Sequence, residues 1–85
     1  MHNWQHDDLY TAYAVSSRHR HILQDSHLCG CFYCLETFQY AQIQAWTDQA
    51  NTAICPYCGI DAVIGSASGY PVNAEFLKAM HIHWF

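Results

Sequence analysis

The sequence contains few charged residues and very few cationic ones. Only 12% of its 85 residues are charged, and Arg18, Arg20 and Lys78 are its three Lys and Arg side chains. Proteins that bind DNA or RNA through the phosphate backbone do so with many Lys and Arg residues. With a formal net charge of −4, this chain is not expected to bind nucleic acid non-specifically.

Long apolar runs and a signal-like beginning are also missing. The first ten residues, MHNWQHDDLY, are polar and acidic. A membrane-spanning helix needs about 20 consecutive apolar residues, and a signal peptide needs a basic start followed by an apolar stretch. We therefore expect neither a membrane span nor export. The expected location is the cytoplasm, where cysteines stay reduced.

The chain is short for a self-supporting core. Its 85 residues predict a single domain spanning 1–85. A core of this size rarely supplies more than about 3–5 kcal/mol, so small folds commonly depend on disulfides, a metal or a partner. Hydrophobic residues make up 52% and aromatic residues 15%. We expect some of these rings to meet a ligand or partner, with a homodimer as one possibility.

Four of the five cysteines form two CxxC pairs separated by twenty residues. Two intervening residues allow a tight turn to direct both sulfurs at one cation, and two such turns complete a tetrahedron around zinc. Pro56 fixes the backbone of the second turn, and Gly59 permits positive φ after it. The pattern predicts one structural Zn²⁺ per chain; a redox dithiol is the main alternative. The predicted ligands are Cys31, Cys34, Cys55 and Cys58.

Cys29 is the remaining cysteine of the cluster CGCFYC. It could replace Cys31 as a ligand, but a one-residue spacer makes a poorer chelating turn. We interpret it as a free, partly buried thiol, with a reactive thiol as the alternative.

Local patterns predict a small α+β fold with short flanking helices. Apolar residues recur at helix-like spacing in 7–15 and near 40–48. Another helix is expected after Ser16 and Ser17, which are its candidate N-caps. Residues 51–65 indicate strand, metal turn and strand, and 66–71 indicate a loop. The last segment, beginning at Asn73 as N-cap, is the best helix candidate.

Several blocks together resemble a family of small bacterial proteins known only as hypothetical or cytoplasmic proteins. The blocks are SSRHR, CGCFYCLETF, IQAW, TAICPYCGIDAVIG, SASGYPV and FLKAMHIHWF. The resemblance implies a zinc-ribbon-like intracellular protein, and the family brings no established activity with it. It runs from about residue 15 to the end, so 1–14 is interpreted as a possible loosely attached N-terminal extension.

Two stretches within these blocks suggest anion binding. SSRHRH places Arg18 and Arg20 beside histidines and hydroxyls at an expected helix start, where free N–H groups favour anions. The loop GSASGYP offers glycines, two hydroxyls and an aromatic ring, without the lysine of a P-loop. Each stretch could equally be an ordinary turn. The candidate ligand-binding residues are Ser17, Arg18, His19, Ser66, Ser68, Gly69 and Tyr70.

These features lead to three classes of function. We favour a non-catalytic binding module for a small anionic, nucleotide-like ligand or for a protein partner. The first alternative is a small phosphate-ester hydrolase with His19 or His21 as general acid or base and Arg18 stabilising charge. The second is a thiol redox or metal-handling protein built on Cys29. His2 and His6 are interpreted as exposed side chains rather than metal ligands, and His27 is a weak alternative ligand. His81 and His83 cannot face the same way if the last segment is helical.

Overall fold

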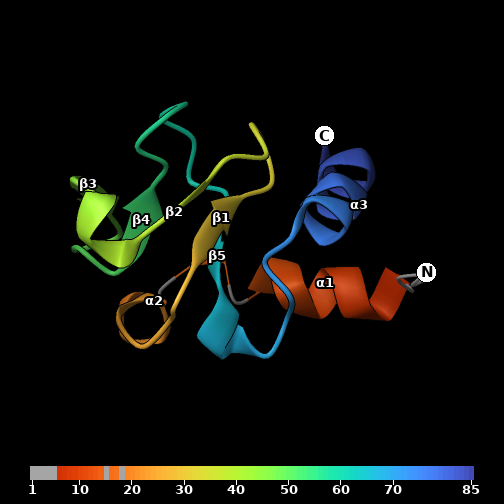
Figure 1. Ribbon diagram of the computed structural model, residues 1–85, viewed down its shortest axis with the longest axis horizontal. Helices are drawn as coiled ribbons and strands as arrows, with labels where there is room; N and C mark the ends of the chain where they lie inside the picture. Colours follow the sequence, from red (N-terminus) through yellow and green to blue (C-terminus); the bar gives the residue numbers. More distant parts are fainter. Residues whose placement is uncertain (1–5, 15, 18) are drawn as a thin grey trace.

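The computed structural model describes residues 6–14, 16–17 and 19–85, which form a small α+β fold of three α-helices and two antiparallel sheets (Figure 1). The helices are α1 (His6–Ala14), α2 (Arg20–Gln24) and α3 (Ala74–Trp84), with 3-10 turns η1 (Tyr40–Gln42) and η2 (Ser66–Ser68). The strands are β1 (Cys29–Cys31), β2 (Thr37–Phe38), β3 (Ala45–Thr47), β4 (Thr52–Ile54) and β5 (Val63–Gly65). Every element is short, so tertiary packing rather than local propensity must stabilise the fold.

The central sheet contains three strands in the order β2-β1-β5. Both pairings are antiparallel, with Cys29 opposite Gly65 and Cys31 opposite Val63. The middle strand is the CGC segment, and all three of its residues are buried. Cys31, the first predicted metal ligand, therefore begins its turn from the most enclosed strand of the sheet.

Two glycines allow helices to approach this sheet from opposite faces. A Cβ atom on Gly30 would lie 2.8 Å from Val72 Cγ1 and 3.0 Å from Leu77 Cδ1. A Cβ on Gly65 would lie 2.9 Å from Leu23 Cδ2. Gly65 lies opposite Cys29, the neighbour of Gly30 in β1, and successive residues of a strand point to opposite faces. Therefore α3 packs on the Gly30 face of the sheet and α2 packs on the Gly65 face.

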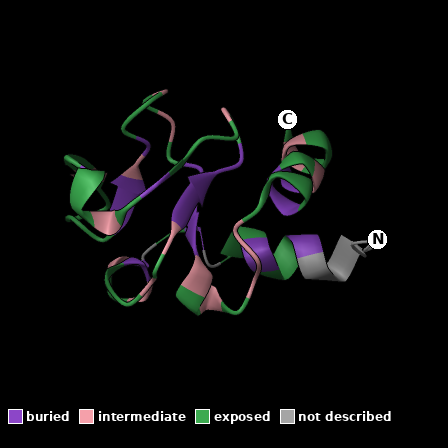
Figure 2. Ribbon diagram, viewed as in Figure 1, coloured by how far each residue is buried: buried purple, intermediate pink, exposed green. Residues whose placement is uncertain are grey.

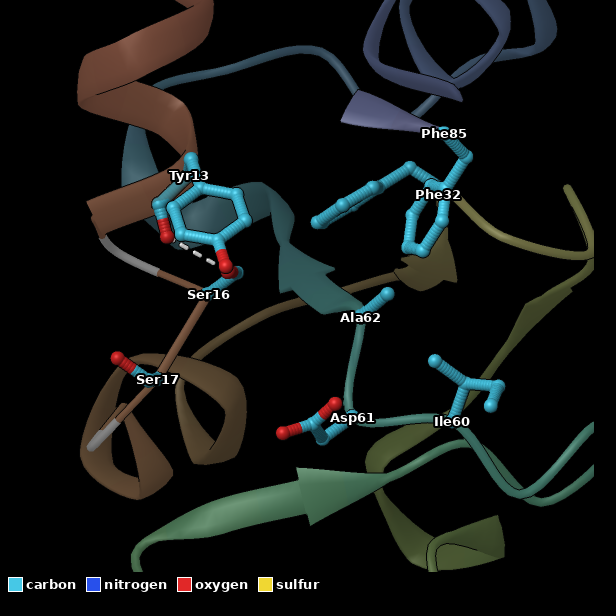
Figure 3. A pocket seen from close by; sticks show the side chains of 8 residues that line it. All are labelled: Tyr13, Ser16, Ser17, Phe32, Ile60, Asp61, Ala62 and Phe85. Atoms are coloured by element: carbon cyan, nitrogen blue, oxygen red, sulfur yellow. Dashed lines mark hydrogen bonds between the residues drawn. The ribbon is translucent and has the colours of Figure 1, made fainter. Parts of the chain in front are cut away.

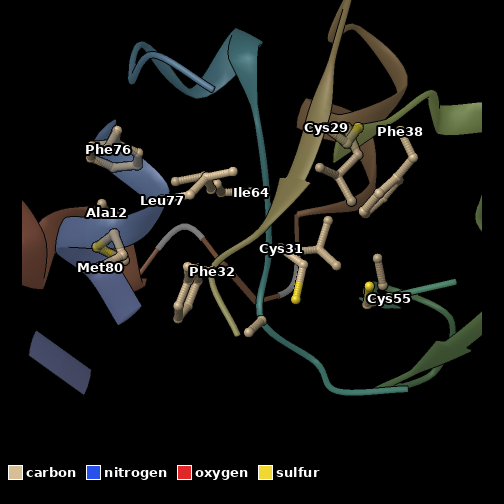
Figure 4. Close-up of a cluster of buried hydrophobic side chains, with 14 of the residues drawn as sticks. Ala12, Cys29, Cys31, Phe32, Phe38, Cys55, Ile64, Phe76, Leu77 and Met80 are labelled. Atoms are coloured by element: carbon tan, nitrogen blue, oxygen red, sulfur yellow. The ribbon is translucent and has the colours of Figure 1, made fainter. Parts of the chain in front are cut away.

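The C-terminal helix supplies much of the core, as the sequence predicts. Its side chains Phe76, Leu77 and Met80 are all completely buried, and part of α3 is coloured as buried in Figure 2. Figure 4 shows them on one side of the strands, with Cys29 and other buried residues on the other side. The predicted cap is confirmed, because Asn73 Oδ1 accepts a hydrogen bond from the Phe76 N–H at 2.8 Å.

Helix α1 is part of the same core. Leu9 is 5% exposed and Ala12 is completely buried. The Trp84 indole N–H donates to the Leu9 carbonyl at 3.3 Å, and α1 packs against α3 (Figure 1). Residues 6–14 are therefore an integral helix rather than a loosely attached extension.

The prediction of a helix near 40–48 is wrong. Only the single turn η1 forms, and Ile43 is already extended at φ −76° and ψ 121°. The chain then enters β3, which pairs with β4 so that Trp46 lies opposite Ala53. This non-local pairing overrides the local spacing of apolar residues, which is a common outcome for short segments.

The prediction that Ser16 or Ser17 caps the second helix is also wrong. α2 begins at Arg20, and His19 at its N-cap position makes no side-chain cap bond. The Ser16 hydroxyl instead donates to the Tyr13 carbonyl at 2.6 Å. The reason is a contact with the residue just before β4: the His19 N–H donates to the Asn51 carbonyl at 2.8 Å, which holds His19 outside the helix.

Candidate metal centre and adjoining cleft

The four predicted ligands meet at one point between the two sheets. One turn follows β1 and the other follows β4, and their four sulfurs lie within 4.8 Å of one another. Cys31 Sγ is 3.6 Å from Cys58 Sγ, and Cys34 Sγ is 3.7 Å from Cys55 Sγ. With metal–sulfur bonds of about 2.3 Å, a regular tetrahedron has edges of about 3.8 Å. The arrangement therefore fits a four-thiolate metal ion.

The two cysteine turns have the same backbone hydrogen bonds at a constant offset in the sequence. The N–H of Leu35 donates to the Cys31 carbonyl at 2.8 Å, and that of Gly59 donates to the Cys55 carbonyl at 3.0 Å. Each turn is closed again by the N–H of its first cysteine, which donates to the carbonyl of the residue five positions later at 3.0 Å. The centre is therefore built from two equivalent chelating turns.

Backbone N–H groups in these turns point at sulfur. The Tyr33 N–H donates to Cys31 Sγ at 3.3 Å, and the Tyr57 N–H donates to Cys55 Sγ at 3.4 Å. Burial raises the pKa of the Cys31 and Cys34 thiols. Burial also acts to raise the pKa of Cys55, but N–H donors from Tyr57 and Cys58, together with the neighbouring Cys58 and Cys34 thiols, outweigh it and lower the pKa of that thiol. Such donors stabilise the thiolate form, which is the form that binds metal.

The residue after each turn has a left-handed backbone. Gly59 has φ +78°, as predicted, while the equivalent residue of the first turn is Leu35 with φ +68°. A non-glycine residue in this region costs about 1–2 kcal/mol. The first turn is therefore the strained member of the pair.

Replacing Leu35 by glycine should raise the free energy of unfolding by up to about 1 kcal/mol, because the strain is removed. The Gly59→Ala variant should lower it by about 1–2 kcal/mol. A Cβ at Gly59 would have no atom within 4 Å, so this loss reports the backbone alone. Urea denaturation of the metal-loaded proteins measures both changes, and shifts of the same sign would contradict the equivalence of the turns.

Cys29 lies outside the cluster, as expected for the spare cysteine. It is completely buried in β1, and burial raises the pKa of its thiol to about 11. The thiol is therefore protonated at neutral pH and unsuited to attack or metal binding. All five cysteines are free of disulfides.

The candidate anion-binding residues near α2 are separated by the fold. Ser17 is exposed, His19 is 1% exposed, and Arg18 lies outside the described residues. The His19 Nε2 accepts a hydrogen bond from the Ala53 N–H at 3.3 Å. His19 therefore helps to hold β4 in place, whereas Ser17 is exposed to solvent.

The hydroxyls of the 65–70 loop are engaged with the backbone. Ser66 Oγ accepts hydrogen bonds from the N–H groups of His27 and Leu28 at 3.0 and 3.3 Å. Ser68 Oγ donates to the Gly65 carbonyl at 2.6 Å. Gly69 provides a left-handed residue at φ +93°, and Tyr70 stacks on Phe76 at 5.5 Å. The loop thus connects β5 to α3 and packs against α2, with both of its serine hydroxyls engaged by the backbone.

The other described residue of the basic stretch, Arg20, is also engaged. Its guanidinium lies 4.5 Å from the centre of the Trp46 ring and donates to the Ala50 carbonyl at 3.0 Å. These contacts fix the β3–β4 hairpin to α2. His21, the other proposed acid or base, is exposed on α2.

A cleft of about 210 Å³ opens beside the metal centre, between the end of α1 and the end of α3 (Figure 3). Three aromatic side chains line it: Tyr13 on one side, and Phe32 and Phe85 on the other. Tyr13 is 47% exposed and Phe85 is 56% exposed, whereas Phe32 is buried behind them. Phe32 is part of the first metal turn, so the cleft and the metal centre share a structural element.

Polar groups complete the cleft. Its lower wall is Ile60, Asp61 and Ala62, the segment that leaves the second metal turn, and Ser16 and Ser17 border the side of α1 (Figure 3). Asp61 is the only charged residue among the described residues that line it. The sequence did not predict this cleft, because its walls come from four segments that are distant along the chain.

The aromatic surface continues beyond the cleft. Tyr33, 44% exposed, meets Phe85 edge to face with ring centres 4.9 Å apart. Tyr13 packs on Trp84 at 4.3 Å. These rings belong to α1, α3 and the first metal turn, so one end of the molecule presents an aromatic face around the cleft.

Comparison with models of known protein families, with curated proteins and with solved structures found no match for this chain. None of the helices in the described residues has the length and apolar character needed to cross a membrane.

Proposed function

We propose that the protein is a small zinc-ribbon-like module in which the four cysteines hold one structural Zn²⁺. Four soft sulfur donors at tetrahedral spacing support zinc. A shell of four thiolates leaves no coordination position for water or substrate. The metal therefore stabilises the fold and takes no part in a reaction.

The protein acts as a non-catalytic binding module, and its binding site is the cleft with the surrounding aromatic face. One observation carries this proposal: two half-exposed rings, Tyr13 and Phe85, line a cleft attached directly to the rigid metal turns. Large exposed aromatic side chains are a common feature of binding sites. The ligand is a small molecule or a side chain of a protein partner.

The alternatives receive less support. A hydrolase would need His19 or His21 at a substrate. The His19 ring is buried and its Nε2 accepts a backbone N–H, and His21 is exposed on α2 but is not among the described residues that line the cleft. A thiol redox role would need Cys29, which is buried and protonated. Free cysteines fit a reducing compartment such as the cytoplasm. The resemblance to small bacterial cytoplasmic proteins stays a prediction.

A fragment screen followed by amide NMR tests the binding site. We expect small cations, anions or neutral aromatics to produce saturable shifts concentrated at Tyr13, Phe85 and 60–62. The Phe85→Ser variant should abolish them, because it removes one wall of the cleft. Ile82→Ser is the matched control, since Ile82 lies three residues earlier in the last turn of α3 and is 69% exposed. Shifts concentrated elsewhere, or equal loss in both variants, would contradict the proposal.

A further inference from the structure

We propose that the cleft selects a small organic ammonium ion, either as a free compound or as the end of a lysine side chain. This inference rests on the proposed function, because it takes the cleft as the binding site. It differs from the anionic ligand that the sequence suggested.

The aromatic walls are the first reason. Aromatic rings carry partial negative charge on their faces, and organic cations bind over those faces. Tyr13 and Phe32 have ring centres 6.4 Å apart with planes inclined by 55°, and Phe32 and Phe85 have centres 5.9 Å apart with planes inclined by 44°. Figure 3 shows Tyr13 facing the other two rings across the opening. Ring centres at these distances belong to rings in contact with one another, so the three rings form one continuous aromatic wall over which an organic cation can lie.

The charge of the cleft is the second reason. Asp61 is exposed at its lower wall, and no Lys, Arg or His occurs among the described residues that line it. The structure gives the Asp61 carboxylate no hydrogen bond or ion pair within the described chain. Ser17 adds an exposed hydroxyl oxygen at the rim. A carboxylate beside aromatic faces attracts a cation and repels phosphate.

The net charge of the whole molecule also favours a cationic ligand. The chain carries a formal net charge of −4, so its surroundings are enriched in cations. The described arginine, Arg20, is already stacked on Trp46 and bonded to a carbonyl, away from the cleft. It therefore offers no competing charge to Asp61.

The test is an NMR titration of the intact, metal-loaded protein with choline, its neutral isostere 3,3-dimethylbutan-1-ol, Nα-acetyl-lysine amide and inorganic phosphate. Choline should shift the cleft amides and bind at least about ten times more tightly than the isostere, because only choline is charged. If choline binds more tightly than the lysine amide, the ligand of the cleft is a free organic cation. If the lysine amide binds more tightly, the ligand is a lysine side chain of a protein partner.

Two variants separate the contributions of charge and ring. Asp61→Asn should weaken choline several-fold and leave the neutral isostere unchanged, while Asp25→Asn, at an exposed residue after α2, should change neither. Tyr13→Leu keeps an apolar wall and should also weaken choline. Equal affinity for choline and the isostere, or preferential binding of phosphate in the cleft, would overturn the inference and leave the proposed function standing. Absence of cleft shifts with every probe and fragment would overturn both.

Discussion

Removing the metal should unfold most of the protein. Zinc bound to four cysteine-type ligands contributes about 10–16 kcal/mol of apparent folding free energy in small domains. A core of this size contributes only about 3–5 kcal/mol by itself. The metal contribution is therefore larger than the remaining stability, and the metal-free chain is expected to lose its tertiary structure.

Amide NMR and near-ultraviolet circular dichroism before and after chelation measure this effect. We expect the dispersed spectrum to collapse with chelator and to return with one equivalent of zinc. Cys34→Ala should behave like the chelated protein, because it removes a ligand. Cys29→Ala is the matched control, since Cys29 is an equally sized side chain outside the cluster, and it should retain the metal. A chelated protein with an unchanged spectrum would contradict a structural role.

The second large effect is expected at Leu77. This side chain is completely buried and lies directly over Gly30. Gly30 belongs to β1, the strand that leads into the first metal turn. Leu77→Ala should lower the free energy of unfolding by about 2–5 kcal/mol, through lost burial and the cavity left behind.

Ile82→Ala is the matched control for Leu77→Ala. Ile82 has a side chain of the same size on the same helix but is 69% exposed, so its truncation should change stability by at most about 0.5 kcal/mol. Urea denaturation in excess zinc measures both variants. Similar losses in the two would show that α3 does not pack as described.

The cluster of four cysteines and the C-terminal helix could be predicted from local sequence. The spacing of the CxxC pairs depends only on the reach of a short turn, and the sulfurs of all four predicted cysteines do meet. The capping role of Asn73 likewise depends on residues within one helical turn. The strand, turn and strand predicted within 51–65 also form, as β4 and β5, although these strands belong to different sheets.

What could not be predicted depends on contacts between distant segments. Trp46 has helical spacing with its neighbours, yet it lies in a strand because β4 pairs with it. His19 resembles a surface ligand residue in sequence, yet β4 encloses it. The cleft likewise needs Tyr13, Asp61 and Phe85 to meet, and no local pattern records that meeting.

Native mass spectrometry of the gently purified protein tests the central claim most directly. The account predicts one zinc ion per chain, retained in Cys29→Ala and lost in Cys34→Ala. A chain that carries no metal under these conditions, or one that keeps its zinc after loss of Cys34, would contradict the four-cysteine centre on which the fold and the cleft depend.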